Sequence, residues 1–136
     1  MHKKIYLKTN EEINVINLTN EVENFIAKSA LTDGAVIVHV TGSTASVSTI
    51  EYEPGLIKDI KKNLLKLFPK DNHYHHHETW NDGNGYSHIM ATIMKPSIIV
   101  PILKGRLALG TWQQIILMDF DNKPRNREVL LKIIPG

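Results

Sequence analysis

The second half of the chain is a series of short apolar segments separated by residues that are typical of turns. This series constrains the fold most strongly, because sequential short strands joined by tight turns pair mostly antiparallel. Glycine and proline mark most of the breaks. The expected strands span residues 88–94, 97–100, 106–109, 112–120 and 127–134. We therefore predict an α+β fold with a compact, mostly antiparallel β-sandwich or barrel-like core and two helices packed against it.

The first half of the chain supplies the two helices. The first is expected from Asn20, which forms a capping-box pattern with Glu23, to a stop at Asp33 and Gly34. The second begins at Pro54 and carries apolar residues at helical spacing, with lysines mostly on the opposite face. Further strands are expected at residues 5–7 and 13–16, as an opening hairpin, and at 35–41 and 45–50, on either side of a turn.

Length and composition exclude several classes of protein. The 136 residues fit a single domain over residues 1–136. The absence of cysteine excludes disulfides, thiolate metal sites and a cysteine nucleophile. A net charge of +2 with only short lysine pairs argues against nucleic-acid binding. Because no apolar run reaches the roughly 20 residues of a membrane span and the N-terminus lacks a signal-peptide core, we expect a cytoplasmic protein with no membrane partner.

Five of the seven histidines lie close together in the sequence. They are His73, His75, His76, His77 and His88. An acidic, Gly-rich connector separates the last of them from the others, and residues 82–85 form a strong turn sequence. We therefore expect His76 and His88 to approach each other.

The pair of His76 and His88 is the predicted centre of a site. The neutral imidazole is the commonest metal ligand in proteins and a proton shuttle near pH 7. The pair could hold a divalent metal, with zinc as the expected ion, or serve as acid and base. The alternative is that they are surface histidines on a polar loop. His2 and His73 are expected at the surface, and His39 as a hydrogen-bonded histidine of the core or between strands.

Acidic residues beside the second helix are further candidates. Glu51 lies at the end of a strand and could be a general base or a third metal ligand. For Glu51 this role and a purely structural one stay open. For Asp59 and Glu53 the simpler explanation is favoured, because an acidic side chain near a helix N-terminus stabilises the helix dipole.

Two groups of residues could bind a phosphate. The hydroxyls of Ser43 and Thr44 lie on a Gly-containing turn, whose backbone amides can hold an anion. Arg125 and Arg127 alternate near the start of a strand, and paired arginines clamp phosphate or carboxylate groups. The alternative for the arginines is an ion pair with a neighbouring acidic residue, Glu128 or Asp121.

These pieces occur in an order that resembles the YjbQ-like family, whose members are often called secondary thiamine-phosphate synthase enzymes. The resemblance covers residues 33–136, and its most specific part is Leu109-Gly110-Thr111-Trp112-Gln113. It implies a compact, largely β, α+β fold and a homotrimer. It also implies a weak thiamine-phosphate synthase activity, which joins a hydroxymethylpyrimidine diphosphate to a thiazole phosphate and releases pyrophosphate.

The family's motif falls on Ser43, Thr44, Glu51, Asp59, Tyr74, His76, Asn84, His88, and Arg125 or Arg127. Many relatives have a histidine where this chain has Gly42, and many read Asp-Gly-Pro-Arg where this chain has Asp121-Asn122-Lys123-Pro124-Arg125. The first departure removes a potential third imidazole from the site. His75, His77, Glu51 or water could then fill that coordination position.

Two functions of different kinds fit these observations. The first is a metal-assisted enzyme for a small phosphorylated metabolite, in which Glu51, His76 and His88 are catalytic and the two histidines hold the metal. Its substrate would contact the following residues: Ser43, Thr44, Asn84, Arg125 and Arg127. The second is a non-enzymatic, trimeric protein that binds a small anionic metabolite or a metal. A third possibility is that the histidines tie a loop across a subunit interface.

Overall fold

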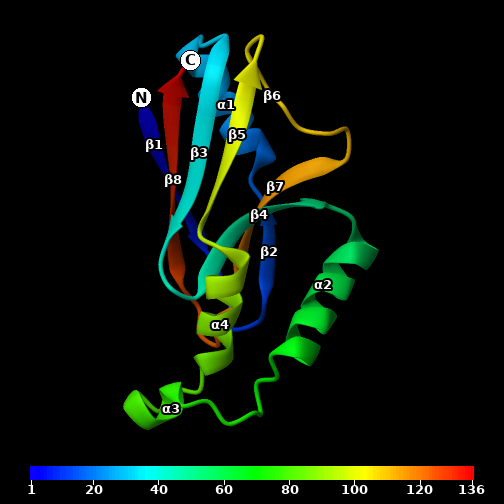
Figure 1. Cartoon of the computed structure of the whole chain (residues 1–136), viewed down its shortest axis with the longest axis vertical. Helices are drawn as coiled ribbons and strands as arrows, with labels where there is room; N and C mark the ends of the chain where they lie inside the picture. The colour runs from blue at the N-terminus through cyan, green and yellow to red at the C-terminus, as the bar shows by residue number, and fades with distance from the viewer.

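The computed structural model describes all residues, 1–136, and contains eight strands and four helices (Figure 1). The strands are β1 (His2–Lys8), β2 (Asn14–Asn17), β3 (Asp33–Thr41), β4 (Ala45–Glu51), β5 (Ser97–Leu103), β6 (Arg106–Leu107), β7 (Gln113–Asp119) and β8 (Asn126–Pro135). The helices are α1 (Thr19–Ser29), α2 (Pro54–Leu67), α3 (His76–Thr79) and α4 (Gly85–Met94). The predicted α+β class is confirmed. The chain has four helices, whereas two were expected.

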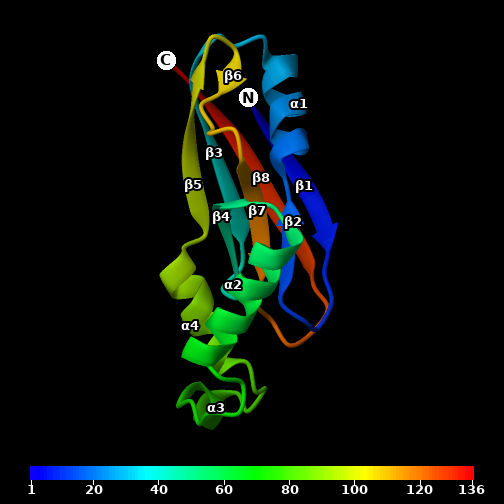
Figure 2. The same cartoon turned by 90° about the vertical axis from the view of Figure 1, so that its right-hand side faces the viewer.

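The strands form two sheets in which all neighbours are antiparallel, as predicted. The larger sheet has the order β1-β8-β3-β5-β6 and the smaller one the order β2-β7-β4. Figure 2 shows α2 in front of the smaller sheet and α1 beside the upper part of the larger one. Helices α3 and α4 extend beyond the lower end of the strands in Figure 1.

The main core lies between the two sheets. On β3, Val36, Val38 and Val40 are fully buried, and the residues between them are more exposed, as the two-residue period of a strand requires. Ile115 and Leu117 of β7 belong to the same cluster, as do apolar residues of α1. The first-half strands predicted at residues 35–41 and 45–50 are therefore confirmed, with the turn at 42–44 between them.

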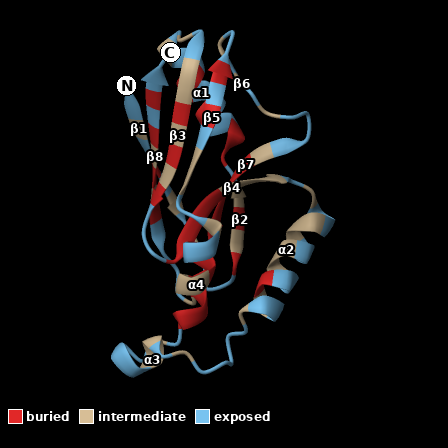
Figure 3. Ribbon diagram, viewed as in Figure 1, coloured by how far each residue is buried: buried red, intermediate tan, exposed pale blue.

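A second core covers the other face of the smaller sheet. Ile116 and Met118 of β7 contact a cluster that contains Tyr86 and Met90 of α4 and Leu64 of α2. Figure 3 shows that the buried part of α4 is mainly its lower half, whereas α2 and α3 are exposed or half-buried over nearly all of their length. This packing fixes α4 against β4, and so places α4 next to the turn between β3 and β4.

The prediction of a strand at residues 88–94 is wrong, because these residues belong to α4. Tyr86, Ser87, Met90 and Ala91 are buried, which is the spacing of one helical face and not the alternation of a strand. A short apolar run fits both patterns when it is read from sequence alone. Packing against the smaller sheet selects the helical conformation.

The predicted opening hairpin is also wrong. β1 pairs with β8 and β2 pairs with β7, so the two strands belong to different sheets. Between them, Thr9 donates its amide hydrogen to the carbonyl of Arg125 (2.9 Å) and its hydroxyl hydrogen to Asp119 (2.8 Å). These bonds hold the chain against the β7–β8 connection at the point where it crosses from one sheet to the other.

The start of one helix was predicted correctly and that of the other was not. α1 begins at Thr19, so Asn20 lies inside the helix and no capping box forms. α2 begins at Pro54, as predicted, and the Glu53 carboxylate accepts hydrogen bonds from two backbone amides of the first turn. None of the four helices combines the length and the apolar character that crossing a membrane requires.

Candidate functional site

His76 of α3 and His88 of α4 lie side by side. Their ring centroids are 4.5 Å apart and their ring planes are inclined by 41°. Asp82, in the connector between the two helices, places its Oδ1 3.5 Å from Nδ1 of His76. The connector thus folds back as predicted, although the two histidines come from two helices and not from a loop and a strand.

The close approach of the two histidines depends on Gly85, the first residue of α4. A Cβ atom at this position would lie 2.7 Å from the Cβ of Tyr74 and 3.4 Å from that of His76. Such a separation from Tyr74 is too short for two carbon atoms, so a side chain would push the segment before α3 away from α4. Tyr74 is held in place because its hydroxyl donates to the carbonyl of Pro69 (2.7 Å).

The environment of His88 favours its neutral form. Burial lowers the pKa of this imidazole, and the neighbouring His76 lowers it further. The carboxylates of Asp121 and Asp82 and a hydrogen bond to the backbone of Ser43 oppose this shift without cancelling it. A neutral imidazole near pH 7 can accept a proton or coordinate a metal.

His88 lines a cavity of about 230 Å³ beside the turn between β3 and β4. Its other lining residues are Gly42, Ser43, Ala45, Ala91, Thr92 and Pro96. Gly42 has a φ of 140°, a conformation that side chains disfavour, and a Cβ atom there would lie 2.8 Å from Nη1 of Arg127. A side chain at position 42 would therefore require Arg127 to move.

The buried carboxylate of Asp121 connects this turn to α4 and β8. It accepts hydrogen bonds from the Asn84 amide (3.2 Å), the Thr44 hydroxyl (3.0 Å) and Nε of Arg125 (2.8 Å). Burial by itself would raise the pKa of Asp121. The hydrogen bonds, including one from the backbone amide of Asn122, outweigh burial and lower the pKa below its ordinary value.

Arg127 points into the protein and not toward solvent. Its Nε donates to Oδ2 of Asp119 (2.7 Å), and its Nη2 donates to Oδ1 of Asp119 (3.1 Å) and to the hydroxyl of Thr44. Thr44, Asn84 and Arg127, all predicted to bind substrate, are thus buried and bonded within the protein. A buried ion pair of this kind is costly to break, because each partner would be left as an unpaired buried charge.

Ser43 and Arg125 are the exposed members of the predicted phosphate-binding group. The Arg125 side chain is 42% exposed and makes the ion pair with Asp121 that the sequence offered as an alternative. The other candidate partner, Glu128, lies near Lys4 instead (3.6 Å). Ser43 lines the cavity beside His88.

Glu51 does not lie near the histidine pair within one chain. It ends β4, six residues beyond Ala45, and strand geometry places the two ends roughly 20 Å apart. Glu51 lines a different cavity with Tyr52 and Trp112, and Asp59 lines another one beside α2. His39 forms a short hydrogen bond with Ser97 on the adjacent strand β5, as expected of an inter-strand histidine.

Three polar residues of the site had no assigned role in the sequence: Asp82, Tyr86 and Asp119. Several buried polar atoms here have no hydrogen-bond partner in the protein, namely His76 Nδ1, Asp82 Oδ1, Asn84 Oδ1 and the Tyr86 hydroxyl. Burial raises the pKa of Tyr86, and the charges of Asp121 and Asp119 add to this effect. Unpartnered buried polar atoms are rare, and a bound ion or ligand is one explanation for them.

Two groups of side chains could hold a metal. His76 and His88 offer two imidazoles, with the Asp82 carboxylate close to the first. The second group consists of His73, His75 and Glu78, and its three ligand atoms all lie within 4.8 Å of one another. The first group is partly buried, and the second is exposed.

The fold and this site define a two-sheet α+β domain with a histidine pair between two helices. The model of the family described as "UPF0047 protein YjbQ-like" matches residues 3–136. The chain therefore belongs to the YjbQ/UPF0047 family, as the resemblance indicated.

Several relatives and solved structures cover nearly the whole chain. A UPF0047 protein of Archaeoglobus fulgidus is 36% identical over 131 residues, covering 96% of this chain and 99% of the relative. The crystal structure of an uncharacterized conserved protein from Clostridium acetobutylicum is 38% identical, with a TM-score of 0.89 and coverage of 97% and 99%. A YbjQ-like protein of unknown function from Sulfolobus solfataricus is 27% identical, with a TM-score of 0.94 and coverage of 100% and 97%.

Proposed function

We propose that the chain is an enzyme that acts on a small phosphorylated metabolite, with His76 and His88 at the centre of its site. The observation that carries this proposal is the position of His88, which lines a cavity, contacts His76 and favours the neutral form. Because its pKa is lowered, the His88 imidazole is neutral near pH 7 and is able to accept a proton there. The Asp82 carboxylate, whose Oδ1 lies 3.5 Å from Nδ1 of His76, would orient the pair.

A divalent metal, zinc in the first instance, is compatible with the same residues. Two imidazoles and a nearby carboxylate are ligands that zinc accepts, and a catalytic site keeps a further position open for water. The metal would act as a Lewis acid toward a phosphoryl oxygen. In that case His76 and His88 would be ligands and not proton carriers, and Glu51 could contribute only from another chain.

The phosphate end of the substrate would lie at the turn between β3 and β4. Ser43 is exposed and lines the cavity. Arg125 and Thr44 both donate hydrogen bonds to the carboxylate of Asp121. We propose that Ser43 and Arg125 contact the phosphate. Thr44, Asn84 and Arg127 would hold this surface in place through their buried hydrogen bonds.

The reaction to test first is thiamine-phosphate synthesis, because the family resemblance implies a weak activity of this kind. Purified protein without a tag would be supplied with a hydroxymethylpyrimidine diphosphate, a thiazole phosphate and a divalent metal. Pyrophosphate release and product formation would be measured. We expect His88→Ala and His76→Ala each to lower kcat/KM by about 10²–10⁴-fold, as loss of an acid–base group does.

The exposed terminal residue His2 provides a matched control, and His2→Ala should retain full activity. Circular dichroism would show that all variants are folded. Absence of turnover by the unaltered protein with this and other phosphorylated substrates would refute the enzymatic proposal.

The alternative proposal is a non-enzymatic homotrimer that binds a small anionic metabolite or a metal. It is favoured by the internal hydrogen bonds of Thr44, Asn84 and Arg127, which leave few free side chains for catalysis. Tight binding of a phosphorylated ligand without any turnover, measured by calorimetry, would support this alternative.

A further inference from the structure

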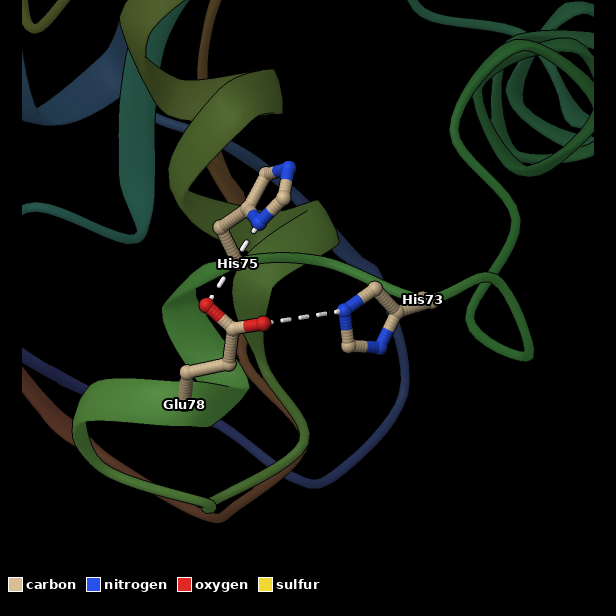
Figure 4. A group of neighbouring side chains, drawn as sticks. All are labelled: His73, His75 and Glu78. Atoms are coloured by element: carbon tan, nitrogen blue, oxygen red, sulfur yellow. Dashed lines mark ion pairs between the residues drawn. The ribbon is translucent and has the colours of Figure 1, made fainter.

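The outward side of the segment around α3 carries two histidines and one glutamate that converge on one another. His73 lies before α3, His75 directly precedes its first residue, and Glu78 lies within it. The two Glu78 carboxylate oxygens are each 3.5 Å from a ring nitrogen, Oε1 from Nε2 of His73 and Oε2 from Nδ1 of His75. Figure 4 shows the carboxylate between the two imidazoles, with both rings turned toward it.

From this geometry we infer a second divalent-metal site, formed by His73, His75 and Glu78 and distinct from the pair of His76 and His88. Two imidazoles and one carboxylate, completed by water, are a ligand set that zinc accepts. Metal–ligand bonds of about 2.0–2.2 Å in a tetrahedron place neighbouring ligand atoms roughly 3.4 Å apart. The two nitrogen–oxygen separations of 3.5 Å, each to a different oxygen of Glu78, are close to this value, and one ligand atom from each residue lies within 4.8 Å of the other two.

The three side chains are free to bind an ion. Their exposed fractions are 67% for His73, 92% for His75 and 64% for Glu78, and none of them forms a side-chain hydrogen bond with another part of the protein. Water and a metal ion can therefore reach all three, and little desolvation opposes binding.

The position of this site suggests a structural role. α3 has only four residues, and so short a helix is marginal without other support. A metal bound to His75 and Glu78 would cross-link the first turn of α3. Its bond to His73 would extend this cross-link to the residues before the helix. His76 belongs to the same turn and faces His88 on the inward side. An ion on the outer side would thus hold in place the segment that carries His76.

The inference does not depend on the proposed function. Zinc titration by calorimetry of the full, untagged chain, after treatment with a chelator, would test it. We expect a saturable zinc-binding event at this outer group, which the double variant His73→Ala/His75→Ala abolishes and Glu78→Gln weakens at least tenfold. Any zinc held by His76 and His88 would remain as a separate event. His2→Ala, which removes an exposed histidine elsewhere, should bind zinc as the unaltered protein does. The variant His76→Ala/His88→Ala should retain this binding event.

Hydrogen exchange supplies a second, structural measurement. Zinc should slow the exchange of backbone amides in residues 73–84 in the unaltered protein, and not in His73→Ala/His75→Ala. Zinc binding that is unchanged in the latter variant, or no binding by the unaltered protein below about 1 mM, would overturn the inference. Loss of zinc binding only in His76→Ala/His88→Ala would also overturn the inference, and it would support a metal at His76 and His88 instead.

Discussion

At the scale of single residues, Asp121 shows how buried charge is stabilised next to the histidine pair. Its carboxylate is almost fully buried, yet its pKa is lowered, because the amide of Asn84 and the hydroxyl of Thr44 donate to it. The side chain of Arg125 adds a further charged donor. The same carboxylate therefore orders both the turn that lines the cavity and the start of α4.

Replacing Asp121 with asparagine should destabilise the protein near neutral pH by about 1–3 kcal/mol, since buried donors lose their charged acceptor. A lowered pKa means that the carboxylate's contribution is fully present above its ordinary value of 3.8 and is lost as the pH falls through the folded-state pKa. Urea unfolding of both proteins at several pH values measures this difference. Asp71→Asn, at an exposed position, is the control. A difference for Asp121→Asn that did not shrink in acid would contradict the prediction.

At the scale of elements, the junction of α3 and α4 sets the geometry of the site. Gly85 lets Tyr74 and His76 pack directly against the first turn of α4. The side-chain amide of Asn122 donates to the backbone carbonyl of Asp82 (2.9 Å) and ties the connector to the residues after β7. The junction is thus held by the close approach at Gly85 and by this hydrogen bond to the connector, with no buried residue in α3.

Gly85→Ala should disturb this junction, because the new methyl group would lie 2.7 Å from the Cβ of Tyr74. We expect a loss of about 1–3 kcal/mol in the free energy of unfolding, as overpacking usually costs. Urea denaturation measures the loss, and nuclear Overhauser contacts between His76 and His88 should weaken in parallel. In Gly110→Ala the nearest atom, Cβ of Gln113, is 3.8 Å away, so that variant should be close to neutral. Equal stability of the two variants would show that α3 adjusts without strain.

At the scale of the whole molecule, the larger sheet has one face against the main core and one face that no helix covers (Figure 1). Large apolar side chains are exposed on this outer face, including Ile99 (66%), Leu103 (56%) and Ile134 (44%). They lie on β5 and β8, on either side of β3. An exposed apolar patch of this kind is typical of a protein–protein interface. It supports the proposal of a homo-oligomer, with a trimer as the state to test.

Ile99→Glu should therefore weaken self-association, because a charge on the sheet face would have to be desolvated in the interface. Light scattering during size-exclusion chromatography would measure the mass over a range of concentrations. Ile93→Glu is the matched control, since Ile93 is similarly exposed (55%) but lies on α4. Dissociation by the α4 variant alone would place the interface elsewhere, and a monomeric unaltered protein would refute the proposal.

Much of the fold could be predicted because the relevant signals are local. Alternating burial on β3 and the apolar stripe of α2 follow directly from residue spacing. The proximity of His76 and His88 followed from the turn sequence between them. The role of Arg127 could not be predicted in this way, because its buried partners Asp119 and Thr44 are 8 and 83 positions away. The distance of Glu51 from the histidines could not be predicted either, because it depends on the direction in which β4 leaves the turn.

The sequence by itself determined the α+β class, the antiparallel pairing, the second helix and the turn that brings His76 toward His88. These depend on residue periodicity, turn residues and proline, which act over a few neighbouring positions. Only the tertiary structure decided that residues 88–94 are helical, that β1 and β2 enter different sheets, and that Arg127 faces inward. The physical reason is that a short apolar run can bury its side chains as a helix or as a strand. Contacts between residues far apart in the chain select one of the two.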